Sequence, residues 1–218
     1  MKRESLSPTT KSKKFKQTTL KPIKEFIQEI PKRIQLDENC FLRFWRKFLP
    51  LEESNTIFQK LLELPFEKVS TVMYDKAMDY PRLFVVMTEE NLKSDQYSLK
   101  KINYTKEVLY LKEKIEKETN SKFNFVLIQL YRNGDDHISF HSDREVIPGN
   151  SIIASLSFGE TRRFVMKNIK NENIKKEFDL INGSLITMEG ETQIFWKHSI
   201  PKQKKVKNPR INLTFRIV

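Results

Sequence analysis

The sequence predicts an α+β protein in which two amphipathic helices precede a jelly roll or two-sheet barrel of short strands. Before residue 121, apolar residues recur every three or four positions, as they do on one face of a helix. After residue 121, apolar and polar residues alternate, and turn-forming pairs such as Asn133-Gly134 and Asn182-Gly183 separate the alternating segments. Helical periodicity followed by many short strands is typical of helices packed on a β-sheet core.

The two helices are expected at residues 52–64 and 105–118. Glu52 and Glu53 stand in the first turn of the first segment, and Thr105 is placed to cap the second. Each segment carries one apolar stripe of the kind that packs against a core. The stripes consist of Ile57, Phe58, Leu61 and Leu62 in the first helix, and of Val108, Leu111 and Ile115 in the second.

Eight segments rich in β-branched and aromatic residues are expected to form the strands. They are 123–131, 137–143, 151–158, 161–167, 177–180, 184–189, 193–198 and 210–217. The stretch 168–176 is rich in lysine and asparagine, and we expect it to be an exposed hairpin tip.

The composition allows one domain with a sizeable core. The chain has 218 residues, of which 38% are hydrophobic and 31% charged. The single cysteine, Cys40, excludes an intramolecular disulfide framework and zinc fingers built on paired cysteines. No run approaches the roughly 18 apolar residues that span a bilayer, and the N-terminus lacks an apolar signal core. We therefore expect an intracellular protein in a reducing compartment, without a membrane partner.

Positive charge is concentrated at the N-terminus. The net charge is +12, and residues 1–35 contain ten basic and three acidic residues. We expect this segment to be a disordered basic arm, and the charge favours nucleic acid as the polyanionic partner. The alternative is a solvated tail on a lysine-rich chain.

A histidine and an aspartate stand two positions apart at the end of one expected strand. Alternate residues of a strand point to the same face, so His141 and Asp143 share a face. His198, one of three histidines in the chain, is the third candidate ligand. Two histidines and one carboxylate occupy one face of an octahedral metal and leave three positions open, which suits non-haem Fe(II) oxygenases. The His-x-Asp triplet taken alone usually means nothing.

The last expected strand has one polar face. That face consists of Arg210, Asn212, Thr214 and Arg216. In a barrel interior two guanidiniums need an anion, and a dicarboxylate matches their hydrogen-bonding geometry. Gln129 and Tyr131, two positions apart on another strand, could donate hydrogen bonds to the same molecule. The alternatives are an edge strand with its polar face in water, and a core tyrosine.

These residues together resemble a known family. Tyr131, His141-Ser142-Asp143, Leu185 to Gly190, Trp196 to Pro201 and Arg210 to Arg216 are similar to motifs of the AlkB family of Fe(II)- and 2-oxoglutarate-dependent dioxygenases. The match is closest to the eukaryotic-type members that repair alkylated DNA, and it runs from about residue 60 to the C-terminus. It implies a double-stranded β-helix (jelly-roll) core at 121–218 and a helical, nucleotide-recognition region at 36–120.

The resemblance also implies roles for individual residues. His141, Asp143 and His198 match the catalytic iron ligands. The expected contacts of 2-oxoglutarate are Gln129, Tyr131, Arg210, Asn212, Thr214 and Arg216. The expected substrate contacts are Tyr74, Arg82, Tyr97, Arg144 and Glu145. Two positions depart from the family pattern: Gln129 replaces the usual asparagine, and Arg144 stands where repair homologues often have an acidic residue.

The implied reaction is oxidative demethylation of alkylated bases in DNA, such as N1-methyladenine and N3-methylcytosine. In this family, O2 oxidises 2-oxoglutarate to succinate and CO2 while an N-linked alkyl carbon is hydroxylated and leaves as an aldehyde. We expect a monomer, located in the nucleus if the organism is eukaryotic and otherwise in the cytoplasm. The alternatives are the same chemistry on RNA or protein, and a catalytically silent nucleic-acid-binding module, which the intact motifs argue against.

Overall fold

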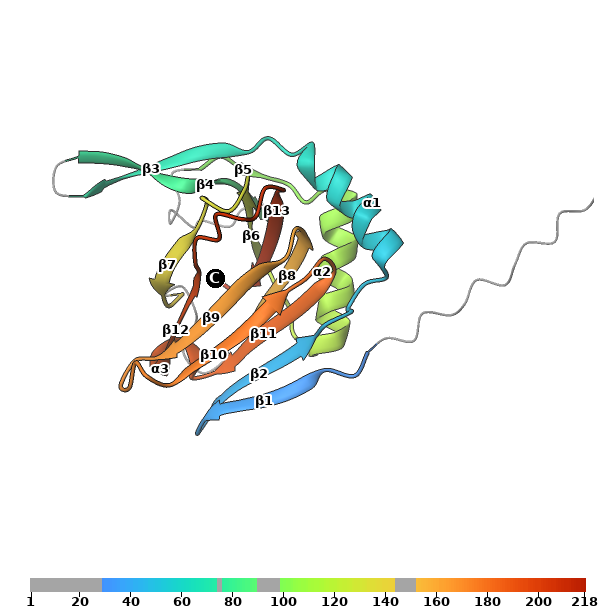
Figure 1. Ribbon diagram of the computed structural model, residues 1–218. Coiled ribbons are helices and arrows are strands. Elements are labelled where there is room, and N and C mark those ends of the chain that lie inside the picture. The colour runs from blue at the N-terminus through green and yellow to red at the C-terminus, as the bar shows by residue number, and fades with distance from the viewer. Residues whose placement is uncertain (1–28, 74–75, 90–98, 144–151) are drawn as a thin grey trace, which may run out of the picture.

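The computed structural model contains two β-sheets with two helices on the outside (Figure 1). It describes residues 29–73, 76–89, 99–143 and 152–218. The larger sheet consists of β1 (Lys32–Asp37), β2 (Cys40–Trp45), β3 (Glu67–Met73), β4 (Lys76–Thr88), β5 (Lys101–Ile102), β6 (Phe125–Tyr131), β8 (Ile153–Gly159), β11 (Ser184–Gly190) and β13 (Arg210–Arg216). The smaller sheet consists of β7 (Ile138–His141), β9 (Arg162–Asn168), β10 (Lys175–Leu180) and β12 (Trp196–Ile200).

The strand order is that of a mostly antiparallel double-layered fold. The larger sheet runs β1-β2-β11-β8-β13-β6-β4-β3, with β5 pairing with β4, and the smaller sheet runs β10-β9-β12-β7. Among the described strands, the pairing of β4 with β5 is the single parallel one. Several neighbours, such as β2 with β11, β6 with β13 and β7 with β12, come from distant parts of the sequence, so residues far apart in the chain meet between the layers.

Two helices cover the outer face of the larger sheet (Figure 1). They are α1 (Leu51–Leu62) and α2 (Lys106–Thr119), and both confirm the predicted helices. Thr105 caps α2 because its hydroxyl accepts the backbone N–H of Val108 at 3.3 Å. Asn120, with φ 52°, ends the helix in the left-handed conformation. No helix among the described residues is long and apolar enough to cross a bilayer.

The alternation within β13 separates two interiors. Ile211, Leu213 and Phe215 pack against the core beneath the helices. The intervening side chains of β13 face the space between the two sheets. Both faces of this central strand are therefore buried, and its arginines do not lie in water.

The eight strands predicted after residue 121 are all present, and the hairpin tip at 168–176 joins β9 to β10 as expected. The prediction for one segment is partly wrong. Residues 193–195, predicted as strand, belong to a helical turn, α3 (Thr192–Phe195), which precedes β12. The backbone N–H groups of Ile194 and Phe195 both donate to the carbonyl of Glu191, at 2.9 and 3.1 Å. These two bonds close a turn that alternation alone does not predict.

The region before residue 121 contains more strand than we expected. β1 to β5 all lie there, and β1 and β2 extend one end of the larger sheet while β3 and β4 extend the other. Residues 32–35, predicted as part of the disordered arm, lie in β1. Residues 1–28 of that predicted arm lie outside the described residues.

One buried arginine joins the loops that precede β7 and follow β12. Arg162 is 1% exposed. Its guanidinium donates to the carbonyls of Asn133 at 3.0 Å and Asp136 at 2.8 Å, both before β7. It also donates to the Pro201 carbonyl at 2.9 Å and to Oε1 of Gln203 at 3.2 Å, both after β12. A single side chain thus fixes one end of each of these two strands.

We expect Arg162→Met to lower the free energy of unfolding by about 3 kcal/mol or more, because several buried oxygens lose their donor. Urea denaturation measures the change. The matched control is Arg163→Met, whose half-exposed guanidinium pairs with Glu177 at 3.6 Å. That substitution should cost less than about 1 kcal/mol. Equal losses for the two variants would contradict the role assigned to Arg162.

Candidate metal centre

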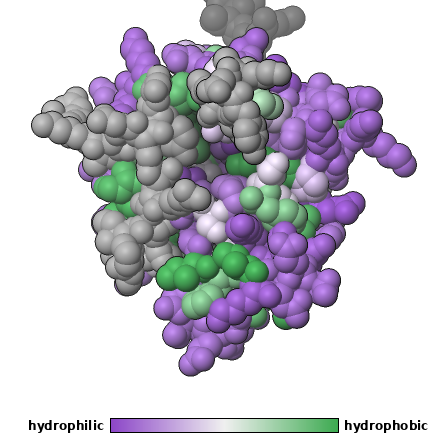
Figure 2. All heavy atoms as spheres, turned by 90° about the vertical axis from the view of Figure 1, so that its left-hand side faces the viewer, coloured by the Kyte–Doolittle hydropathy of each residue, from purple (hydrophilic) through white to green (hydrophobic). Residues whose placement is uncertain are grey.

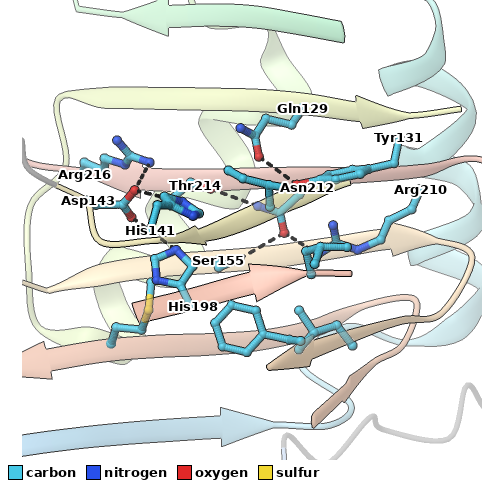
Figure 3. Close-up of a pocket in the computed structure, with 15 residues that line it drawn as sticks. Gln129, Tyr131, His141, Asp143, Ser155, His198, Arg210, Asn212, Thr214 and Arg216 are labelled. Atoms are coloured by element: carbon cyan, nitrogen blue, oxygen red, sulfur yellow. Dashed lines mark hydrogen bonds and ion pairs between the residues drawn. The ribbon is translucent and has the colours of Figure 1, made fainter. Parts of the chain in front are cut away.

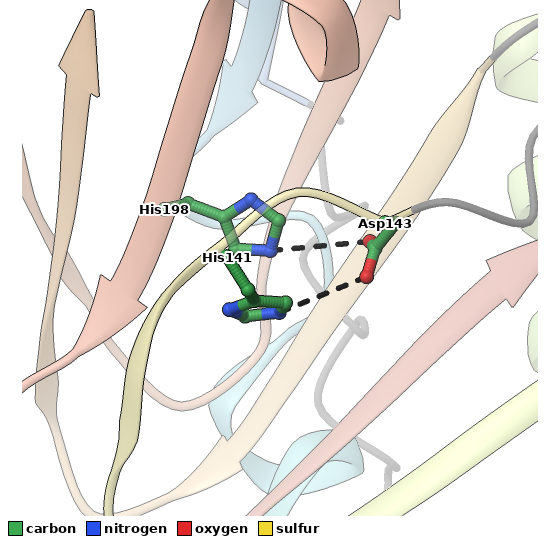
Figure 4. A group of neighbouring side chains, drawn as sticks. All are labelled: His141, Asp143 and His198. Atoms are coloured by element: carbon green, nitrogen blue, oxygen red, sulfur yellow. Dashed lines mark ion pairs between the residues drawn. The ribbon is translucent and has the colours of Figure 1, made fainter. Parts of the chain in front are cut away.

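Two adjacent strands of the smaller sheet bring the candidate metal ligands together. β12 pairs with β7 so that His198 lies directly opposite His141. Their ring centroids are 4.2 Å apart. Asp143 follows β7 by two residues and turns its carboxylate toward both imidazoles (Figure 4). One candidate ligand atom from each residue lies within 4.8 Å of the others, as the sequence predicts.

The carboxylate lies between the imidazoles and an arginine. Oδ1 of Asp143 is 3.7 Å from Nε2 of His141, and Oδ2 is 3.9 Å from Nε2 of His198. Arg216 donates to Oδ1 at 3.0 Å. Burial, the largest effect, favours the protonated acid, but Arg216, His198 and His141 together outweigh it and hold the pKa of Asp143 below its ordinary value. The carboxylate is therefore ionised at neutral pH.

Both imidazoles are neutral, as metal binding requires. Burial, with a contribution from His141, lowers the pKa of His198 to about 3. Burial likewise lowers the pKa of His141. Two neutral imidazoles and one carboxylate, with no fourth His, Cys, Asp or Glu joining them in the described part of the chain, form the donor set of a non-haem Fe(II) site with open positions. The donor chemistry fits Fe(II).

A narrow pocket between the sheets extends from this triad. We call it the inner chamber. Figure 3 shows it running from Asp143 and Arg216 at one end to Tyr131 and Arg210 at the other. Its described lining comprises Gln129, Tyr131, Ile138, His141, Asp143, Ser155, Phe164, Leu180, Met188, His198, Ile200, Arg210, Asn212, Thr214 and Arg216. All six residues predicted to contact 2-oxoglutarate therefore line one pocket.

Arg210 lies at the far end of the inner chamber with more than half of its N–H donors unused. It is 1% exposed, and Nη2 donates to Asn212 at 2.7 Å and to Ser157 at 2.8 Å. Nε and Nη1 have no partner among the described residues. Burial lowers the pKa of Arg210 to about 10, so the side chain is still a cation at neutral pH. A buried cation with free donors fits a carboxylate.

Smaller polar groups complete the wall of the inner chamber. The hydroxyl of Tyr131 donates to Gln129 at 3.2 Å, and the ring of Tyr131 lies 5.2 Å from the Arg210 guanidinium carbon. Asn212 donates to Thr214 at 2.9 Å and accepts from Ser155 at 3.0 Å. A cation at one end, a metal-ligand set at the other and hydroxyl and amide groups between them match an elongated dicarboxylate such as 2-oxoglutarate.

A wider pocket opens beside the triad on the outer side. This outer chamber has a volume of about 350 Å³ and lies between β4 and β7. It shares Gln129, Ile138, His141, Asp143 and Arg216 with the inner chamber. Figure 2 shows the molecule from the left-hand side of Figure 1 as a largely hydrophilic face with small, separate apolar groups. The lining of the outer chamber includes His141 and Asp143 but not Arg210, so a ligand there would reach the metal ligands without contacting the far end of the inner chamber.

The structure places one of the five predicted substrate residues in this chamber. Arg82 is buried, donates to the carbonyl of His137 at 3.1 Å and lies against the rings of Tyr80 and Phe84. The other four residues lie where no placement or side chain is described: Tyr74, Tyr97, Arg144 and Glu145. Their roles stay predictions.

Several pocket residues were not among the predicted site residues. Ser155 lines the inner chamber, and Ser157 accepts from Arg210. Their spacing is the sequence signal that could have identified them: they stand two positions apart in an otherwise apolar strand, so both face the side opposite the core. Met188 also lines the inner chamber and Tyr80 the outer chamber, but their sequence context does not distinguish them from core residues.

The chain is similar to known proteins in sequence. The family model described as 2OG-Fe(II) oxygenase superfamily matches residues 41–216. Bovine alpha-ketoglutarate-dependent dioxygenase alkB homolog 3 is 36% identical over 184 residues, which cover 78% of this chain and 64% of the relative. The DNA oxidative demethylase ALKBH2 of Arabidopsis thaliana is 31% identical over 219 residues, which cover 86% of this chain and 69% of the relative. The chain thus spans about two thirds of the length of these relatives.

The fold is also shared with a solved structure. The structure of OsALKBH1 superposes with a TM-score of 0.60 at 13% identity, covering 86% of this chain and all of the other. This likeness supports the jelly-roll α+β fold predicted from the sequence.

Proposed function

The chain belongs to the 2OG-Fe(II) oxygenase superfamily, and from this membership we propose that it removes alkyl groups oxidatively from bases in DNA, using Fe(II), O2 and 2-oxoglutarate. N1-methyladenine and N3-methylcytosine are the proposed lesions. The observation that carries the proposal is that two pockets meet at His141 and Asp143, two members of the candidate metal-ligand triad. Relatives named as DNA oxidative demethylases support DNA as the substrate.

The residues of the inner chamber would hold the co-substrate and the metal. His141, Asp143 and His198 would bind Fe(II), which when bound supplies the activation of O2 needed to oxidise a C–H bond. Arg210 would bind the distal carboxylate of 2-oxoglutarate through Nε and Nη1, which have no partner among the described residues. Arg216 would keep Asp143 ionised and oriented. The chain thereby orders both reactants before the alkylated base enters.

The outer chamber would receive the base. An alkyl group inside a duplex cannot reach a buried metal, so the nucleotide must leave the stack. The chamber wall offers stacking surfaces for it: the rings of Tyr80 and Phe84 lie 5.9 Å apart, and the guanidinium of Arg82 packs over both. Flat aromatic and guanidinium surfaces of this kind bind bases without strict sequence preference.

Positive charge would supply the contact to the phosphate backbone. The net charge is +12, and the loop between β12 and β13 carries Lys202, Lys204, Lys205 and Lys207. We expect the affinity for DNA to fall steeply with salt, because each neutralised phosphate releases counterions. A salt titration of binding by fluorescence anisotropy measures the slope, and a flat slope would remove these lysines from the proposed interface.

The experiment that tests the function is a demethylation assay. The protein is incubated with Fe(II), 2-oxoglutarate, ascorbate and single-stranded DNA that carries N1-methyladenine, and the DNA is measured by mass spectrometry. We expect each event to remove one methyl mass from the DNA and to form one molecule of succinate. An RNA of the same sequence is the comparison: faster turnover of the RNA would replace the proposed substrate. The absence of both succinate formation and methyl loss would contradict the proposed activity.

A further inference from the structure

Asp143 lies outside the strand pairing that fixes the two histidines. His141 is the last residue of β7 and lies opposite His198 of β12, so the ladder between these strands sets the spacing of the imidazoles. Asp143 comes two residues after β7 ends, so the ladder does not extend to its backbone. A contact outside the ladder holds the backbone of Asp143 next to the histidines.

Gln193 makes that contact from α3. Its Oε1 accepts a hydrogen bond from the backbone N–H of Asp143 at 2.8 Å. Its Nε2 lies 3.3 Å from Sδ of Met188, to which it donates. This second contact fixes which way the amide points and presents the oxygen, not the nitrogen, to Asp143. A residue 50 positions away in the sequence thus sets the place of the carboxylate.

Ser142 joins the same two segments beside this contact. Its hydroxyl donates to the carbonyl of Trp196 at 3.0 Å. The partners Gln193 and Trp196 both lie within five positions of His198 in the sequence. The segment 193–198 therefore supplies one candidate ligand and also holds the backbone that carries another. Arg216 contacts the side chain of Asp143, through a hydrogen bond to Oδ1 of the carboxylate.

We propose that Gln193 is a positioning residue for the metal centre. It contributes no ligand atom; it holds Asp143 at the separation from His141 and His198 that a bound metal needs. Replacing the partners that orient metal ligands typically weakens metal binding by about 10- to 100-fold. The proposal rests on the iron site of the proposed function and is independent of DNA being the substrate.

The test measures metal affinity directly, with Mn(II) as the probe and the full chain as the protein. Electron paramagnetic resonance of free Mn(II) gives the bound fraction. We expect Gln193→Ala to weaken Mn(II) binding by about 10- to 100-fold. Gln193→Glu keeps an oxygen at the same reach and should bind Mn(II) at least nearly as well as the unaltered protein. Ile194→Ala, in the same turn with a 60% exposed side chain, should leave binding unchanged.

A second readout separates positioning from general stability. Mn(II) should raise the thermal midpoint of the unaltered protein, because a ligand that binds the folded state stabilises it. This rise should shrink in Gln193→Ala and persist in Gln193→Glu. Where Gln193→Ala does not fold, as judged by circular dichroism, Gln193→Asn takes its place, since its amide is one methylene short of Asp143.

Three results would overturn the proposal. They are unchanged Mn(II) affinity in Gln193→Ala, equal weakening in the alanine and glutamate variants, and absence of Mn(II) binding by the unaltered protein. Metal binding without demethylation is a different result: it would reject the proposed function and leave the role of Gln193 standing.

Discussion

His141→Ala should abolish turnover, with a loss of about 1,000-fold or more in the rate of methyl removal. A loss of that size corresponds to about 4 kcal/mol of transition-state stabilisation. The reason is geometric: the imidazole is one of three candidate ligands whose atoms lie within 4.8 Å of one another, and two remaining ligands do not form the face of an octahedral site. His141 is half-buried, so its removal leaves the core intact.

The measurement pairs turnover with the thermal midpoint in the presence and absence of Mn(II). His141→Ala should lose the midpoint rise as well as the activity. His137→Ala is the matched control. That histidine lies in the same segment, its Nδ1 is hydrogen-bonded to the Asp135 carbonyl, and it belongs to no metal-ligand group among the described residues. The control should keep the metal-induced rise. A His141→Ala protein that still binds Mn(II) like the unaltered chain would exclude this triad as the metal site.

Arg210→Met should weaken the binding of 2-oxoglutarate by about 100-fold or more. Two charge-assisted hydrogen bonds from Nε and Nη1 would be lost, each worth about 1.5–3 kcal/mol. The folded protein without ligand should gain stability from the same change, because a fully buried cation without a carboxylate partner among the described residues gives way to an apolar side chain of similar length. Binding and stability should therefore move in opposite directions.

Titration calorimetry with 2-oxoglutarate in the presence of Mn(II), together with urea denaturation, measures both effects. Arg210→Lys keeps the charge but not the planar guanidinium, and it should fall between the unaltered protein and the methionine variant. The affinity for Mn(II) alone should not change in either variant, since Arg210 lies at the far end of the inner chamber from the triad (Figure 3). Unaltered binding of 2-oxoglutarate by Arg210→Met would show that the carboxylate lies elsewhere.

Local patterns were sufficient for the part of the fold that holds the site. Strict alternation in β13 predicted that Arg210 and Arg216 share one face, and the structure buries both in the wall of the inner chamber. The pairing of His141 with His198 could not be derived from spacing, because 57 positions separate them, but the scarcity of histidine made the choice small. The face on which a functional residue lies can be predicted from the sequence when its strand is short and its polar and apolar residues alternate regularly.

The N-terminal strands were missed for a physical reason. β1 is an edge strand with exposed Lys32 and Arg33, and charged residues that protect an edge have the same composition as a solvated tail. β2 lies between two strands and carries apolar residues on both faces, which removes the alternation that identifies a strand. The contact of Gln193 with Asp143 has no local signature, since it joins a side chain to a backbone group 50 positions away.

The position of β7 at the edge of the smaller sheet has a consequence for how the metal is held. β7 has four residues, pairs on one side with β12 in the described sheet, and exposes Ser139 and Phe140. Short edge strands open locally at a lower free energy than the whole protein, and their amide hydrogens exchange sooner. His141 is in place only while β7 is closed, so the measured metal affinity is the intrinsic affinity multiplied by the closed fraction. Metal binding and the closing of this strand are thus one coupled equilibrium, in which the ion slows hydrogen exchange along β7.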